Sequence, residues 1–206
     1  MSQVDLWELE RGLAAQGLGA ICGVDEAGRG PLAGPVCAAA VLLPLGVEIP
    51  GLNDSKKLSD KKRRELFDVI CQKALSFGIA FATEQEIDRI NILQATFLAM
   101  ARAVSQLSQK PDLVLVDGNR EPELDVPVQT VVGGDGKSAS IAAASILAKV
   151  SRDRVMLLMD PVYPQYQFAK HKGYGTKVHR EALLTYGPCP IHRKTFLTKI
   201  LGQRHE

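Results

Sequence analysis

The chain has 206 residues, 46% of them hydrophobic and 23% charged, with a formal net charge of +2 at pH 7. This length suits one large domain or one domain with a helical appendage, and the apolar fraction provides a substantial core. The near-balanced charge argues neither for nor against a nucleic-acid partner. No stretch reaches the roughly 18 uninterrupted apolar residues of a membrane helix, and the first nineteen residues lack a secretory-signal pattern, so no membrane partner is expected.

The cysteines are scattered through the chain without C-x-x-C spacing. That distribution is typical of reduced, packed thiols rather than of a disulfide framework or a zinc site. A cytoplasmic protein is therefore expected.

The most informative stretch is residues 21–35, ICGVDEAGRGPLAGP, which follows a short amphipathic helix predicted over residues 4–13. An apolar strand delivers Asp25 and Glu26 into a glycine-rich loop, and a second buried strand is predicted over residues 36–43. Side chains alternate between the two faces of a strand, so both acids cannot hide in one core. Adjacent carboxylates either repel or share a cation, and Mg²⁺ and Mn²⁺ prefer carboxylate oxygens. The pair is interpreted as half of a metal site.

Two other interpretations of this stretch stay open. Most Asp-Glu pairs belong to solvated acidic turns. The segment from Gly28 to Ala33 also fits the dinucleotide fingerprint G-x-G-x-x-A, with Asp54 about twenty residues further on. That fingerprint should open a helix, whereas the next segment is short, apolar and bounded by prolines, and two carboxylates would repel a pyrophosphate. The metal site ranks first, the solvated turn second and the nucleotide loop third.

A polar loop over residues 51–59 leads into a helix predicted over residues 60–75, with Ser59 as its N-cap. The loop and the first turn carry a basic cluster, namely Lys56, Lys57, Lys61, Lys62, Arg63 and Arg64. A solvated helix face is the ordinary explanation of such a cluster. Because the cluster flanks a loop of small polar residues, contact with a phosphate backbone is the favoured hypothesis.

A third strand is predicted over residues 77–83, and a capping box at Thr83 starts a short helix that precedes a longer one over residues 91–107. The next buried strand, residues 112–117, ends in Asp117 followed by glycine. Ligands gather beyond strand ends in open α/β sheets. Asp25, Glu26 and Asp117 are therefore predicted to share one cavity.

A fifth strand is predicted over residues 126–132, at a sheet edge because it contains a proline, and a long helix over residues 139–159. The connection Gly133-Gly-Asp135-Gly-Lys-Ser138 has the strand, Gly-Lys-Ser, helix layout of a P-loop. That motif requires a glycine where Val131 stands, and Asp135 would point its charge into the phosphate cradle. A P-loop ranks below a carboxylate metal site and is kept as an alternative.

Residues 163–179 combine aromatic and basic side chains in an irregular segment, and the tail that includes Arg193 is basic. Such side chains can stack on nucleotides and hold phosphates. Tyr174 lies between two glycines that present its ring, which favours a contact role over core packing. His171 and His179 have no partner at metal-site spacing, so surface contacts are favoured for them.

Five motifs together resemble bacterial ribonuclease HII over about residues 20 to 195. They are Asp25-Glu-Ala-Gly-Arg-Gly30, Asn53-Asp-Ser-Lys-Lys-Leu58, Val116-Asp-Gly-Asn119, Gly134-Asp135 with Ser140-Ile-Ala-Ala-Ala-Ser-Ile-Leu-Ala-Lys149, and His171-Lys-Gly-Tyr-Gly175. The resemblance implies an α/β fold, with an RNase H-like mixed five-stranded sheet flanked by helices. A catalytic domain is expected over residues 1–160, with a short N-terminal helix before residue 20, and a C-terminal helical and irregular extension over residues 161–206 is expected to complete the substrate groove.

The same resemblance implies a monomeric endonuclease that cuts the RNA strand of RNA–DNA hybrids and nicks ribonucleotide-containing duplex DNA. The implied catalytic and metal-binding set is Asp25, Glu26, Asp117 and Asp135, with two divalent ions, Mn²⁺ or Mg²⁺. Two such ions can activate a water and stabilise the leaving oxygen of a phosphodiester. The substrate-binding candidates are Gly28, Arg29, Gly30, Lys56, Lys57 and Tyr174. A non-catalytic nucleic-acid binder is the alternative from another class.

Overall fold

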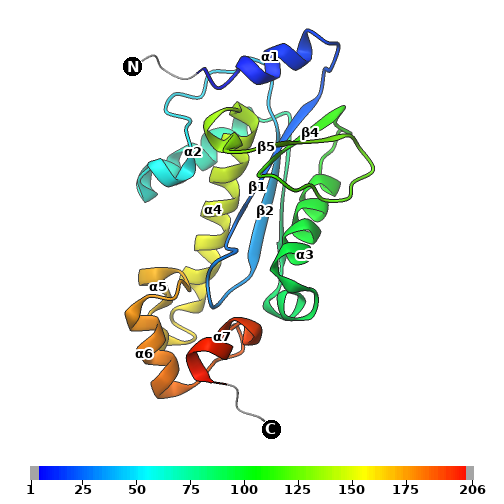
Figure 1. Cartoon of the computed structure of the whole chain (residues 1–206). Coiled ribbons are helices and arrows are strands. Elements are labelled where there is room, and N and C mark those ends of the chain that lie inside the picture. Colours follow the sequence, from blue (N-terminus) through cyan, green and yellow to red (C-terminus); the bar gives the residue numbers. More distant parts are fainter. Residues whose placement is uncertain (1–4, 203–206) are drawn as a thin grey trace.

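A computed structural model describes residues 5–202 and contains a five-stranded sheet in the order β3-β2-β1-β4-β5, with helices on both faces (Figure 1). The strands are β1 (Ile21–Ala27), β2 (Val36–Leu42), β3 (Ser76–Ala82), β4 (Leu113–Asp117) and β5 (Val128–Val131). β2 is antiparallel to β1 and β3, whereas β4 is parallel to β1 and β5. The predicted mixed five-stranded sheet is confirmed.

The helices are α1 (Glu8–Ala14), α2 (Asp60–Lys73), α3 (Glu84–Ser105), α4 (Ala139–Met159), α5 (Phe168–His171), α6 (Lys177–Tyr186) and α7 (Lys194–Leu201). The two helices predicted after Thr83 run together as α3, with a kink at Asn91, whose φ is 66°. Val4, the first residue of the predicted N-terminal helix, lies outside the described residues. Among residues 5–202, no helix is long and apolar enough to cross a membrane.

The core is built from strands that are buried on both faces. All seven residues of β2 are buried. Ala38, Ala40 and Leu42 face one core cluster that includes α3, whereas the alternate residues of β2 face a second cluster with α2 and α4. This two-sided burial explains why β2 is an uninterrupted apolar run.

Helix α4 packs directly against β1, which brings its N-terminus close to the acidic end of that strand. A Cβ atom built on Gly23 would lie 2.1 Å from the carbonyl carbon of Ser140, so this position requires glycine. The small residues of α4 permit the same close approach, and residues 139–148 are all buried. The connection before α4 is therefore held beside β1.

Helix α1 is anchored to the N-terminus of α4 by Glu10, whose side chain is buried. One carboxylate oxygen of Glu10 accepts hydrogen bonds from the hydroxyls of Ser138 (2.6 Å) and Ser140 (2.7 Å) and from the Ser140 amide (3.1 Å). Ser138 also caps α4 by accepting the amide of Ile141. The start of α4 is thus fixed from two sides.

Helices α5, α6 and α7 gather at the far end of α4 (Figure 1). Tyr166, Phe168, Leu183 and Leu197 form a cluster there, which also includes Ala33 from the loop between β1 and β2. The predicted domain boundary at residue 160 stays a proposal, and α4 ends one residue before it.

Candidate metal centre

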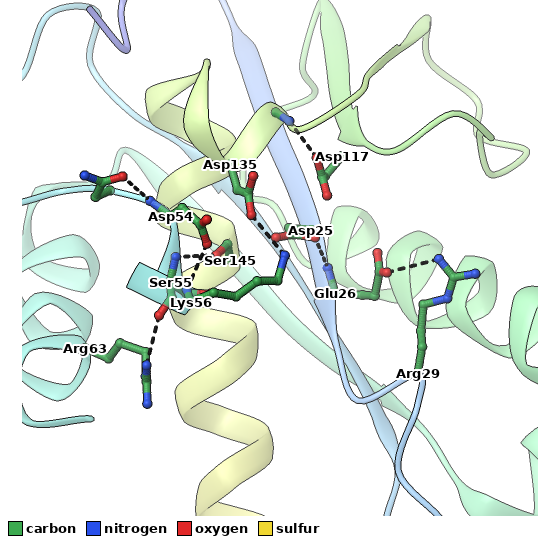
Figure 2. Close-up of polar contacts among 12 residues, drawn as sticks. Asp25, Glu26, Arg29, Asp54, Ser55, Lys56, Arg63, Asp117, Asp135 and Ser145 are labelled. Carbon is green, nitrogen blue, oxygen red and sulfur yellow. Dashed lines mark hydrogen bonds and ion pairs between the residues drawn. The ribbon is translucent and has the colours of Figure 1, made fainter. Parts of the chain in front are cut away.

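Three carboxylates from separate elements converge at one end of the sheet (Figure 2). Asp25 belongs to β1, and Asp117 ends the neighbouring parallel strand β4. Asp135 lies in a 3-10 turn, residues 134–136, just before α4. One oxygen atom from each carboxylate lies within 4.8 Å of the others. Strand β1 continues through Ala27, so Asp25 and Glu26 lie in the strand and not in the loop after it, which corrects the sequence prediction.

Burial and the charges of neighbouring acids destabilise the ionised forms of Asp25 and Asp117. Asp25 is only 5% exposed, and burial followed by the charges of Glu26 and Asp117 raises its pKa well above the usual value. Burial also raises the pKa of Asp117, although the Gly134 amide donates a hydrogen bond of 2.6 Å to its carboxylate. A divalent cation would relieve this repulsion, and the donor set consists of the oxygen ligands that Mg²⁺ and Mn²⁺ prefer.

Glu26 points to the other side of β1, as expected from strand alternation. Its carboxylate lies 3.3 Å from the guanidinium of Arg29 and is not part of the three-acid cluster (Figure 2). Burial raises the pKa of Glu26, and the charge of Arg29 partly opposes that shift. Glu26 and Asp117 both line a cleft of about 320 Å³ beside α3, together with Arg120. The membership of Glu26 in a metal-binding quartet stays a prediction.

The loop after β2 delivers Lys56 to the acids. The Lys56 ammonium lies 3.2 Å from Asp135, although its side chain is 78% exposed. Burial lowers the pKa of Lys56, but the hydrogen bond to Asp135 and the nearby carboxylates outweigh it and raise the pKa. The Ser55 amide bonds to Ser145 of α4 (3.4 Å), which fixes the loop (Figure 2).

The basic cluster is divided between exposed residues and residues that support the structure of the loop. Lys57 is exposed beside Lys56. Arg63 instead donates hydrogen bonds to the carbonyls of Ser55 and Leu58, so it stabilises the conformation of the loop. Arg64 pairs with Asp60. Within the loop Lys56 and Lys57 are both exposed, and Lys61 is also exposed on the first turn of α2.

The glycine-rich loop and Tyr174 form the exposed rim beside the acids. Gly28 is buried, with a φ of 98°, whereas Arg29 and Gly30 are exposed. A Cβ atom built on Gly30 would lie 3.9 Å from the Tyr174 ring, so ring and loop are neighbours. Tyr174 is 43% exposed, with the guanidinium of Arg152 5.8 Å from its ring centre. The sequence prediction that its ring is presented to solvent agrees with this exposure.

The family model described as Ribonuclease HII matches residues 22–199. The chain belongs to the ribonuclease HII family. Ribonuclease HII of Endomicrobium trichonymphae is 57% identical over 93% of this chain and 92% of its own, and that of Idiomarina loihiensis is 62% identical over 85% and 94%. The crystal structure of ribonuclease H2 from Pyrococcus horikoshii has a TM-score of 0.73 at 28% identity and covers 88% of this chain and 97% of its own.

Membership of the ribonuclease HII family makes the protein a ribonuclease H, a hydrolase and a nuclease. The P-loop alternative does not fit, because the glycine-rich connection before α4 carries an acid of the three-carboxylate cluster. The non-catalytic alternative is wrong, because the relatives that show the family are ribonucleases.

Sequence reasoning missed several buried polar residues of this ribonuclease HII. His179 was expected at the surface, yet it is fully buried and bonds to the Tyr174 carbonyl (2.9 Å) and to His192 (2.9 Å). Arg193 was assigned to a basic tail, yet its side chain is 0% exposed. Glu10 lies outside the family motifs. The sequence contains only a weak indication that Arg193 is buried: it lies four residues before Leu197, so the two share one face of a helix.

Proposed function

We propose that the enzyme hydrolyses the RNA strand of RNA–DNA hybrids and nicks duplex DNA on the 5′ side of a single embedded ribonucleotide, leaving a 5′-phosphate. The observation that carries the catalytic part is the convergence of three carboxylates within 4.8 Å, from three elements that meet only in the folded chain. A solvated acidic turn would not explain the burial of Asp25.

Asp25, Asp117 and Asp135 would hold divalent ions, Mg²⁺ or Mn²⁺, and Glu26 would join them from the α3 side. Bound ions of this kind activate water and stabilise the developing charge on the leaving oxygen. No side-chain nucleophile is then needed. The protein's own part is to keep the acids close together at the groove, where the Asp117 carboxylate is held by the Gly134 amide.

Substrate contacts are assigned to the exposed rim of the site. Lys56 and Lys57 would contact phosphates, and Gly28, Arg29 and Gly30 would approach a sugar with their backbone groups. Tyr174 would supply a hydroxyl to the 2′-oxygen of the ribonucleotide and a ring to stack on the next, deoxy sugar. The 2′-hydroxyl is the group by which a protein tells RNA from DNA. We further propose that the enzyme works as a monomer in the cytoplasm.

A labelled DNA duplex with one ribonucleotide tests this function in a single gel. We expect one nick on the 5′ side of the ribonucleotide with Mg²⁺ or Mn²⁺, and none with a chelator. The matched control is the same duplex with deoxyribose throughout, which should stay intact. Cleavage in chelator, or equal cleavage of the all-DNA control, would contradict the proposal.

The two loop lysines are expected to set part of the salt dependence of binding. Replacing Lys56 and Lys57 by Ala should make the slope of log affinity against log salt shallower by about 0.9 for each phosphate that is no longer neutralised on duplex DNA, without moving the cut. Lys73→Ala is the matched control, because Lys73 is an exposed lysine at the other end of α2. A slope that changes equally in the control would make this loop an ordinary solvated surface.

A further inference from the structure

Arg193 is a buried cation that lies outside the three-carboxylate cluster, so the proposed metal centre does not explain its burial. Its side chain is 0% exposed, and burial, followed by the charge of Arg152, lowers the pKa of its guanidinium to about 9. Among residues 5–202 it forms no ion pair with a carboxylate. A buried charge is costly unless it is well hydrogen-bonded, so the hydrogen-bond partners of Arg193 indicate which segment it stabilises.

Those partners are backbone carbonyls of the glycine-rich loop. The Arg193 guanidinium donates to the carbonyl oxygens of Gly28 (2.6 Å), Arg29 (2.9 Å) and Gly34 (2.9 Å). Gly28 and Arg29 are consecutive, so two successive peptide planes have their oxygens turned toward the same buried group. The planar fork of a guanidinium can reach several acceptors at once, which the single ammonium of lysine does less well.

The orientation of the carbonyls fixes the direction of the amides. The chain has no cis peptide bond, and in a planar trans peptide the carbonyl of one residue and the N–H of the next point in opposite directions. The N–H groups of Arg29 and Gly30 therefore point away from the buried guanidinium. Within residues 5–202 neither amide donates a hydrogen bond to another protein group, and both residues are exposed.

We propose that Arg193 is a positioning residue that presents the Arg29 and Gly30 amides as a preformed pair of donors for the ribonucleotide 2′-hydroxyl. This inference rests on the proposed cleavage at ribonucleotides and deepens it. A hydroxyl oxygen has two lone pairs, so it can accept from both amides. Carbonyls that accept from a cation also polarise their peptides, which strengthens the opposite N–H as a donor.

The orientation of the amides can be tested without a substitution in the loop or at Arg193. In Asp117→Asn protein, which should bind without cutting, Arg29 and Gly30 amides should exchange rapidly with solvent when free. Adding a duplex with one ribonucleotide should shift their ¹⁵N resonances and slow their exchange, and the matched all-DNA duplex should do so less. If the Arg29 and Gly30 amides are already protected from exchange in the free protein, they face inward. That result overturns the proposed role of Arg193, independently of the Arg193 variants.

The role of the guanidinium is tested by Arg193→Lys and Arg193→Gln in the same background, with the Kd of both duplexes measured with Mn²⁺ present. Loss of up to two hydrogen bonds should reduce the preference for the ribonucleotide duplex about tenfold. Leu197→Ala is the control, because Leu197 is buried among the C-terminal helices four residues after Arg193, but its side chain cannot donate a hydrogen bond to the loop. It should lower the Tm while the preference stays unchanged.

The possible outcomes separate this inference from the function on which it rests. An unchanged preference in folded Arg193 variants overturns the positioning role and leaves ribonucleotide cleavage intact. Equal loss of preference in Leu197→Ala reduces Arg193 to a structural residue. Equal resonance shifts with both duplexes would show that the amides bind a phosphate rather than the hydroxyl, and this too overturns the inference.

Discussion

Asp25→Asn is expected to abolish cleavage while making the metal-free protein more stable at neutral pH. The substitution keeps the shape of the side chain and removes a charge that the metal centre needs. Loss of one group that stabilises transition-state charge typically costs about 10²–10³-fold in rate. Stability should move the other way, because the burial of Asp25 and the neighbouring charges oppose its ionisation in the folded state.

The pH dependence follows from the direction of that pKa shift. The folded-state pKa of Asp25 lies above the usual value of 3.8, so the folded protein binds the proton more tightly than the unfolded chain. The metal-free wild type should therefore lose stability as pH rises from about 4 through the raised folded-state pKa. Asp25→Asn removes this titration, so its advantage in Tm should be present at pH 7 and vanish at about pH 3.

Thermal melts with chelator and with Mn²⁺ check both parts of this prediction. Mn²⁺ should raise the Tm of the wild type more than that of Asp25→Asn, because a ligand that binds only the folded state stabilises it. Asp125→Asn, a change of an exposed acid elsewhere, is the matched control and should alter neither activity nor the Tm profile. Wild-type cleavage rates in Asp25→Asn at saturating metal would remove Asp25 from the metal centre.

Tyr174→Ala is expected to lower nicking at a single ribonucleotide by about 5- to 150-fold, the range that corresponds to the loss of one aromatic stacking contact. Tyr174→Phe keeps the ring and loses only the hydroxyl, so a smaller decrease of about 2- to 13-fold is expected. The fold should survive both changes, because the contacts that hold residue 174 use its backbone. Its amide donates to the His171 carbonyl, and its carbonyl bonds to the His179 ring.

Tyr186→Ala provides the control for the Tyr174 series. Tyr186 is also exposed, at the end of α6, and its removal should leave nicking unchanged. The measurement is kcat/KM on a duplex with one ribonucleotide, with circular dichroism to confirm folding. If both Tyr174 variants nick as fast as the wild type, the ring is packing and the ribonucleotide is recognised by other groups.

Local patterns were sufficient to predict most of the helices and strands, whereas the mixed five-stranded sheet was implied by the family resemblance. The extent of α4 was predicted closely, because its run of small and apolar residues is a local signal. Strands β1, β2 and β4 are apolar runs that end near glycine or proline. Their exact ends were less predictable: β1 continues through Asp25 and Glu26 because pairing with β2 persists to Ala27, and no local signal reports that pairing.

The acidic set of the site was also accessible from the sequence. Asp25 and Asp117 each follow an apolar run within a strand, and β1 and β4 pair in parallel with Val24 opposite Val116, so these two acids meet in register. Asp135 was identified through the family resemblance, and its approach to β1 depends on Gly23, which lets α4 pack within contact distance. Residue types and spacing were enough for Asp25 and Asp117 because an acid that follows an apolar run is a local feature, whereas Asp135 required the family resemblance.

The support of the site was decided by the tertiary structure alone. Arg193 is separated along the chain by 165 residues from Gly28 and by 164 residues from Arg29, whose carbonyls it binds. Glu10 is separated by 128 residues from Ser138. Sequence periodicity reports only which face of an element is apolar, so a buried arginine that binds distant carbonyls has the same local pattern as a solvated one. Local residue patterns therefore indicate the elements and the acids that follow apolar runs, whereas long-range hydrogen bonding sets how the glycine-rich loop presents its amides.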